Sequence, residues 1–314
     1  MFSGPFAGEW TAVGTLACWA IGSHFFEAAG HRVGSMAVNL LRLFLALAMF
    51  CGLLWVRDGQ PIAGGFSTNA WGWLLFSGVI GFSLGDMCLF RAFVEIGPRL
   101  ALLLMSLNAP MSAIIGWIWL GESYTVLQWL GMFVTLVGVG WVILERPAED
   151  ESLPDAAKPE NNRLVRRRRN ITTSGVLLGL GGAAGQAVGG VTSKYGLGTG
   201  DPFAATQIRV IGGIAGLVVF FFFIRWWGRT MHALKDGRAM AWMTIGAFLG
   251  PFLGVALYLR AIQLTNIGVV ATITALLPVV VIPISMFVNN EHVSPRSFFG
   301  AMVAFLGIWL MFVH

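Results

Sequence analysis

The stretch "GFSLGDMCLFRAF", residues 81–93, has a second copy in this chain, "GPFLGVALYLRAI", residues 250–262. An offset of 169 residues (250 − 81) pairs Gly81 with Gly250 and Arg91 with Arg260. The same register continues without a gap for some sixty residues, as far as Gly138 and Gly307. A match of this length at one fixed offset indicates an internal duplication.

The composition assigns the chain to a lipid bilayer. Of its 314 residues 56% are hydrophobic and only 11% are charged, and the mean hydropathy is +0.75. A soluble domain carries about 25% charged residues. The net charge of +5 does not indicate a nucleic-acid partner, because the basic residues lie at the ends of apolar runs. The three cysteines, Cys18, Cys51 and Cys88, have no metal-type spacing, so we expect no metal site. We also expect no cofactor.

Ten apolar runs follow one another, and each is about long enough to cross a bilayer as a helix. One long polar segment, residues 145–170, separates the first five runs from the last five and is interpreted as a disordered linker. We therefore predict an all-α integral membrane fold with ten transmembrane helices, organised as repeats 1–144 and 171–314 around linker 145–170. The runs are 10–28, 35–56, 70–94, 99–119, 126–144, 173–194, 203–226, 240–262, 267–288 and 296–313.

An odd number of helices per repeat has a geometric consequence. The second copy enters the membrane from the opposite side, so the two repeats are inverted about an axis in the membrane plane. Inverted repeats are typical of secondary transporters, which bind their substrate near the midplane at the repeat interface.

The sequence also resembles a known family. Residues 89–144, "LFRAFVEIGPRLALLLMSLNAPMSAIIGWIWLGESYTVLQWLGMFVTLVGVGWVIL", are similar to the second half of an EamA repeat. The features that carry the resemblance are Ala92, Pro110, Gly121-Glu122, Gly131 and Gly138, and the second copy keeps Ala261, Glu291, Gly300 and Gly307. The resemblance implies the drug/metabolite transporter superfamily, ten helices, and export or exchange of small metabolites. It says little about the substrate.

Asp86 is the deepest acidic residue of the apolar runs. A charge at bilayer depth costs about 2.5–3.5 kcal/mol on insertion scales, so it is a functional hypothesis by default. One interpretation is a carboxylate that binds a proton or cation in a cavity and couples transport to it. The other is an ion pair with an intramembrane arginine such as Arg42, which holds helices together. The second repeat has Val255 at the equivalent place, and this asymmetry favours the functional interpretation.

Among the other ionisable residues of the apolar runs, two pairs are candidates for a role inside the membrane. His24 and Glu27 are three residues apart on one helix face and are candidates for a second titrating pair, although a solvated position suits Glu27 and a satisfied polar contact suits His24. Arg42 and Arg209 hold equivalent places in the two repeats, which favours a structural role. The alternative is that they bind a carboxylate of the substrate.

Further polar and aromatic residues are candidates for a substrate cavity. The polar ones are expected to donate or accept hydrogen bonds and the aromatic ones to form an apolar wall, although each also suits simple packing. Three prolines interrupt the fourth and ninth runs, either as tolerated kinks or to free backbone carbonyls toward the cavity. The cavity candidates are Trp19, Ser106, Asn108, Gln186, Tyr258 and Thr274, and the prolines are Pro110, Pro278 and Pro283.

The sequence thus predicts a multi-pass transporter of the cytoplasmic (inner) membrane. It would move a small metabolite, an amino acid or an amphipathic compound, by alternating access as efflux or exchange. Protons are the candidate coupling partner, and the protein would act as a monomer or homodimer. Most Lys and Arg residues follow odd-numbered runs, which favours external termini, whereas the resemblance implies internal ones. The rival functions are a non-transporting receptor or scaffold, a channel, and an intramembrane enzyme. We expect no enzyme, because the five histidines are scattered and no nucleophile, base or metal constellation is visible.

Overall fold

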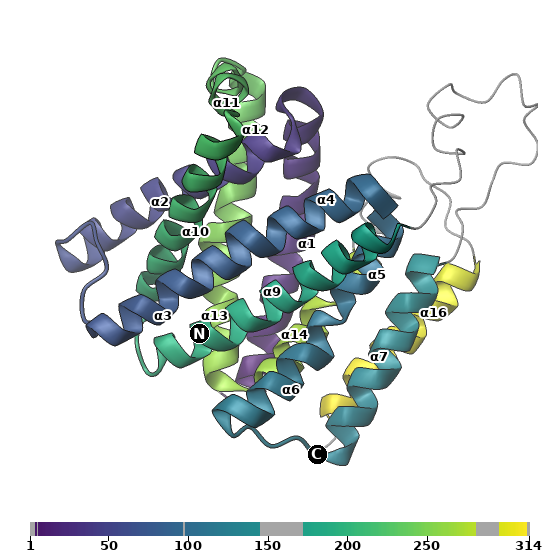
Figure 1. Ribbon diagram of the computed structural model, residues 1–314. Helices are drawn as coiled ribbons and strands as arrows, with labels where there is room; N and C mark the ends of the chain where they lie inside the picture. Colours follow the sequence, from purple (N-terminus) through teal and green to yellow (C-terminus); the bar gives the residue numbers. More distant parts are fainter. Residues whose placement is uncertain (1–3, 5, 97, 145–171, 281–294, 313–314) are drawn as a thin grey trace, which may run out of the picture.

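The computed structural model describes residues 4, 6–96, 98–144, 172–280 and 295–312, and all regular structure in these residues is helical (Figure 1). Pro283 lies outside the described residues. The first half contains α1 (Ala7–Val33), α2 (Ser35–Asp58), α3 (Thr68–Gly78), η1 (Val79–Gly85), α4 (Asp86–Ile96), α5 (Pro98–Ser106), α6 (Asn108–Leu120) and α7 (Val126–Leu144). The second half contains α9 (Thr173–Leu197), α10 (Pro202–Ile224), α11 (Trp227–Ala233), α12 (Gly237–Ala247), η2 (Phe248–Gly254), α13 (Val255–Leu264), α14 (Ile267–Thr274) and α16 (Pro295–Phe312).

Seven helical stretches in the described residues are long and apolar enough to cross a membrane. Two shorter apolar stretches, Ile267–Val280 and Phe298–Phe312, accompany them. Large apolar side chains on their outer faces, such as Trp117, Phe133 and Phe305, are exposed, which suits contact with lipid. The seven spans are Ser35–Asp58, Thr68–Ile96, Leu100–Leu120, Val126–Leu144, Thr173–Leu197, Pro202–Ile224 and Gly237–Leu264.

Local signals set several helix ends. The Asp201 carboxylate accepts a hydrogen bond from the backbone N–H of Ala204, and Pro202 occupies the first turn, so α10 begins there. The residue after α2 is Gly59, with φ +72°, and the residue after α6 is Gly121, with φ +67°. Glycine adopts this left-handed conformation at little steric cost, which explains where both helices stop.

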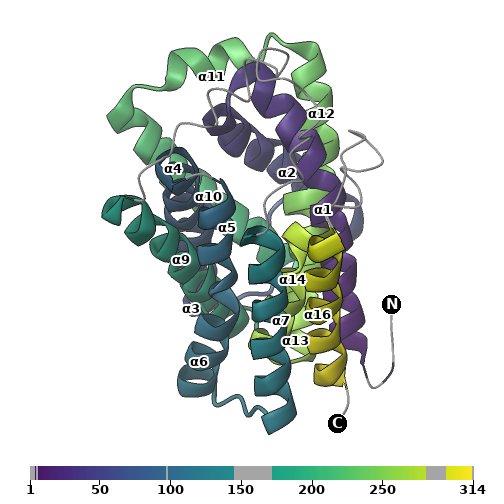
Figure 2. The same ribbon diagram turned by 90° about the vertical axis from the view of Figure 1, so that its right-hand side faces the viewer.

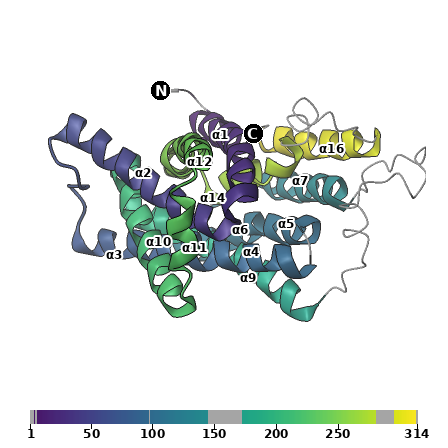
Figure 3. The same cartoon turned by 90° about the horizontal axis from the view of Figure 1, so that it is seen from above.

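The last helices of the two halves, α7 and α16, pack along each other at one edge of the molecule (Figures 1 and 3). A methyl group on Gly138 would lie 2.7 Å from the carbonyl oxygen of Gly300, and one on Gly307 would lie 2.6 Å from that of Gly131. The repeat register makes Gly131 equivalent to Gly300 and Gly138 equivalent to Gly307. The contact of Gly138 with Gly300 is therefore repeated, with the two halves exchanged, by the contact of Gly307 with Gly131. This is the reciprocal pattern of a two-fold axis between antiparallel helices.

The first helix of each half packs against the third helix of the other half. Helix α1 contacts α12, η2 and α13, and α9 contacts α3, η1 and α4 (Figure 2). A methyl on Gly22 of α1 would lie 3.4 Å from Leu249, and one on Gly189 of α9 would lie 3.2 Å from the Cα of Gly81. Small residues at these positions let the backbones approach closely.

Both third helices contain a π-helical segment at the same place in the repeat. Residues Val79–Gly85 form η1 and Phe248–Gly254 form η2, and the 169-residue offset superposes one on the other. Pro251 lies inside η2 and has no N–H to donate, whereas Phe82 holds that place in η1. The proline is therefore not the common cause. Such segments are rare, and many mark functional sites.

The fourth helix of each half is broken at equivalent points. Leu107 separates α5 from α6, and Ala275 and Leu276 follow the end of α14. A proline comes three residues after the first interrupted residue in both cases, Pro110 and Pro278. The predicted interruption of these two helices is thus present in the described residues.

Candidate functional site

A cavity of about 310 Å³ lies between the two halves of the protein. Its lining comes from the first four helices of each half, and none of the described lining residues belongs to α7 or α16. The two π-helical segments reach it through Phe82 and Pro251. The cavity therefore lies at the interface of the two repeats, where the sequence places the substrate site.

Asp86 lies in the wall of this cavity, as the first residue of α4 directly after η1. Its carboxylate accepts a hydrogen bond from Arg42 Nη2 at 2.5 Å and another from Gln186 Nε2 at 2.9 Å. Gln186 Nε2 also donates to the carbonyl oxygen of Gly81 in η1, at 3.2 Å. The carboxylate thus joins α2, α4 and α9. It forms the ion pair with Arg42 that the second interpretation expects, and this pair lies in the cavity wall.

Arg42, on α2, is the basic partner of this pair and also lines the cavity. The side chains of Arg42 and Asp86 are exposed by only 19% and 12%. The guanidinium of Arg42 lies over the ring of Phe26, 5.3 Å from its centroid. Both charges are thus largely removed from solvent and depend on each other for compensation.

Arg209, on α10, is the second arginine of the cavity wall and is 4% exposed. Its guanidinium lies over the ring of Phe82, 5.1 Å from the centroid. Its Nε and Nη1 atoms are buried and have no hydrogen-bond partner among the described residues. The structure thus treats the two equivalent arginines differently.

Trp19 of α1 and Tyr258 of α13 form an aromatic wall of the cavity. Their rings are stacked, with centroids 5.8 Å apart and an angle of 25° between the planes. A stacked pair of this kind offers a flat apolar surface with polar atoms at its edges.

All six predicted cavity residues line the cavity, including Gln186 and the aromatic pair. Ser106 and Thr274 end α5 and α14, at the two helix breaks. Because proline has no N–H, Pro110 and Pro278 donate nothing to the carbonyls four residues earlier, which are those of Ser106 and Thr274. Of these two prolines, Pro278 lines the cavity, whereas Pro110 is not among the described lining residues.

His24 and Glu27 are not among the residues that line the cavity. His24 Nδ1 lies 3.9 Å from Glu27 Oε2, and the Glu27 side chain is 62% exposed. The pair therefore forms on one helix face as the spacing predicts, but the structure does not bring it together with Asp86 at the cavity.

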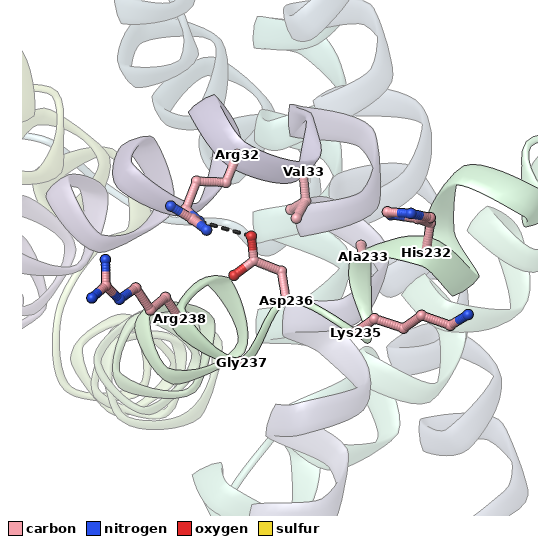
Figure 4. Close-up of a pocket in the computed structure, with 8 residues that line it drawn as sticks. All are labelled: Arg32, Val33, His232, Ala233, Lys235, Asp236, Gly237 and Arg238. Carbon is pink, nitrogen blue, oxygen red and sulfur yellow. Dashed lines mark hydrogen bonds and ion pairs between the residues drawn. The ribbon is translucent and has the colours of Figure 1, made fainter.

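A second hollow lies outside the cavity, where the end of α1 meets the turn between α11 and α12 (Figure 4). It is larger, about 630 Å³, and more open. Arg32 Nε donates to the carboxylate of Asp236 at 2.8 Å there, with Lys235 and Arg238 nearby. Its charges are partly solvated, whereas those of the inner cavity are buried, so the inner cavity is the candidate site.

Sequence reasoning missed the π-helical segments and the aromatic faces that hold the two arginines, Phe26 and Phe82. Nothing in the sequence marks these phenylalanines among the 24 that the chain contains. Among the described residues no group of three or more His, Cys, Asp or Glu side chains is placed to hold a metal ion.

Comparison with known proteins agrees with this architecture. A family model for the EamA-like transporter family matches the chain over residues 6–144 and again over 173–313. No curated protein matches. A solved structure described only as "Crystal structure of protein" shares the fold at a TM-score of 0.67 and 14% identity, and the alignment covers 97% of each chain. With two matches that together span nearly its whole length, the chain belongs to the EamA-like transporter family.

Proposed function

We propose that this protein is a secondary active transporter that moves a small metabolite across the cytoplasmic membrane by alternating access. Seven candidate spans, together with α1 and the two shorter apolar stretches, give the ten transmembrane helices of this proposal. The observation that carries it is the Arg42–Asp86 ion pair in the wall of a cavity between the repeats. Charged groups at membrane depth that face a cavity are typical of substrate and ion pathways.

Asp86 is the proposed coupling residue. Protonation of its carboxylate removes the negative charge that Arg42 and Gln186 now contact, and so weakens the link between α2, α4 and α9. A proton that is bound on one side of the membrane and released on the other then biases which repeat arrangement is favoured. For the direction of transport, the resemblance to the EamA family favours export or exchange of the metabolite.

The test uses the full chain, purified and reconstituted in liposomes that are loaded with a mixed pool of small metabolites. A pH gradient is imposed and the pool is read by mass spectrometry. We expect selective loss of one compound class from liposomes with the wild-type protein, and loss of the gradient-driven part of that flux in Asp86→Asn. The matched control is Glu95→Gln, because Glu95 is an acid of the same helix that pairs with Arg91 and does not line the cavity.

Equal gradient-driven flux in wild type and Asp86→Asn would remove Asp86 from the coupling mechanism. Folded wild-type protein that moves no compound under any gradient would overturn the transporter proposal and favour a receptor or scaffold.

A further inference from the structure

The two halves of the cavity differ in one charge. Arg42 and Arg209 hold equivalent places in the two repeats, and both line the cavity. Arg42 is paired with Asp86, and the repeat register makes Val255 the equivalent of Asp86. Val255 also lines the cavity, so the place where a second acid would neutralise Arg209 is occupied by an apolar side chain.

Arg209 therefore carries a buried charge for which the described residues provide no carboxylate partner. The ion pairs of these residues include none to Arg209, its Nε and Nη1 have no hydrogen-bond partner, and Phe82 offers only its ring face. An uncompensated charge of this kind is destabilising. The charged residues of the lining are Arg42, Asp86 and Arg209, so one positive charge remains unbalanced.

The remaining polar groups argue against a positively charged ligand group. Asp86 is the acid among the described lining residues, and its two oxygens are already bonded to Arg42 and Gln186. An ammonium group would have no free carboxylate to bind. An anion, in contrast, would supply the charge that Val255 does not.

We propose that Arg209 binds the anionic group of the substrate, and that the substrate is a small organic monoanion such as a monocarboxylate with an uncharged apolar body. The stacked rings of Trp19 and Tyr258 are the apolar surface for that body. A volume of about 310 Å³ is at the lower end of the range for ligand pockets, which suits a compact ligand. This inference rests on the proposed function, because it names the substrate class of the same cavity.

The direct test measures ligand-induced thermal stabilisation of the purified full-length protein in detergent. The probes share one body and differ in charge: 3-phenylpropionate, its methyl ester, phenylethylamine and the zwitterion phenylalanine, with shorter and longer carboxylates and with sodium chloride alone. We expect the carboxylates to raise the melting temperature, and the ester, the amine and chloride not to do so. A charge-assisted contact accounts for roughly tenfold to 150-fold in affinity, so Arg209→Gln is expected to lose that factor and Arg209→Lys less of it.

Val255→Asp is the most specific variant, because it supplies the acid that the second repeat lacks. We expect it to fold, to melt no lower than the wild type, and to lose carboxylate binding by the same factor as Arg209→Gln. Val255→Asn is its control, because it changes the polarity without the charge and is expected to retain the preference for the carboxylate over its ester.

Several outcomes would overturn the inference: equal stabilisation by acid and ester, protection by chloride alone, full carboxylate binding in Arg209→Gln or Val255→Asp, or no protection by any carboxylate of the series. Its failure is distinguishable from that of the proposed function. If liposome flux depends on Asp86 but is the same for charged and uncharged substrates, only the proposed anion site at Arg209 is refuted. If carboxylates bind in an Arg209-dependent way but no compound crosses the membrane, only the transport function is refuted.

Discussion

Removal of both partners of the Arg42–Asp86 pair should destabilise the protein by less than the sum of the two single removals. The two side chains are 19% and 12% exposed, so neither charge can turn to solvent when its partner is lost. Breaking a buried pair costs about 3–5 kcal/mol in free energy of unfolding. For Arg42→Gln we expect the lower end, about 3 kcal/mol, because Gln186 still donates to the orphaned carboxylate. At roughly 2–4 °C per kcal/mol, the melting temperature should fall by about 6 °C or more.

Asp86→Asn should cost about as much, because it leaves Arg42 and Arg209 as two uncompensated cations in one cavity. The double variant Arg42→Gln/Asp86→Asn removes both charges of the pair and should recover about 2 kcal/mol relative to the sum of the single costs. The assay is thermal unfolding of the purified protein in detergent, as a double-mutant cycle.

The control is Arg57→Gln on the same helix, whose ion pairs with Asp58 and Asp201 are exposed, with 41% exposure of the arginine side chain. We expect a change of at most about 1 kcal/mol there. Single costs that add within about 0.5 kcal/mol in the double variant would refute the reasoning, since independent sites add to that precision.

Two further predictions concern packing and pH. Gly138→Leu should destabilise the protein by roughly 1–3 kcal/mol, because its Cβ would overlap the backbone nitrogen of Ala304 on α16. Gly140→Leu, whose Cβ would meet only a flexible side-chain methyl of Leu103 at 3.3 Å, should cost less in the same thermal assay. The backbone N–H of Ala239, and then the Arg32 guanidinium, lower the pKa of Asp236 below its usual value. The stabilisation that this gives is present above the unfolded-state pKa of Asp236 and is lost as the pH falls through its folded-state pKa. The difference in melting temperature between wild type and Asp236→Asn should therefore become smaller on acidification. A difference that becomes larger at low pH would contradict this.

The duplicated stretch and the hydropathy pattern suffice to predict an all-helical membrane fold in two similar halves. The repeat register also links Ser106 with Thr274, which hold nearly equivalent places before the prolines of the broken helices, and both line the cavity. The position of the ionisable pair of α1 is predicted less well. Its spacing correctly predicts that His24 and Glu27 share a face, but not which neighbour covers that face.

What the sequence could not provide is the contact between distant elements. Two arginines and one intramembrane aspartate are visible in the sequence. Only the folded arrangement, in which the side chains of Arg42 and Gln186 meet the carboxylate of Asp86, decides that Arg42 takes the acid and Arg209 does not. The sequence does show that Val255, and not a second acid, stands at the position equivalent to Asp86. It indicates asymmetry between the repeats. Its meaning becomes clear only from the structure, in which Val255 lines the cavity and no described carboxylate pairs with Arg209.

The π-helical segments give the third and eighth helices a way to turn without unwinding. Each segment accommodates one residue more per turn than the α-helix on either side. When such an extra residue is passed along a helix, the residues in between rotate by about 100°, because that is the angle between successive residues of an α-helix. Asp86 follows η1 directly and Val255 follows η2 directly. In each half, a one-residue shift of the π-helical segment would therefore act on the residue at which the two repeats differ in charge. A shift in η1 would rotate the charged side chain of Asp86, whereas the same shift in η2 would rotate only the apolar side chain of Val255. The conformational changes of the two halves would therefore differ in energy.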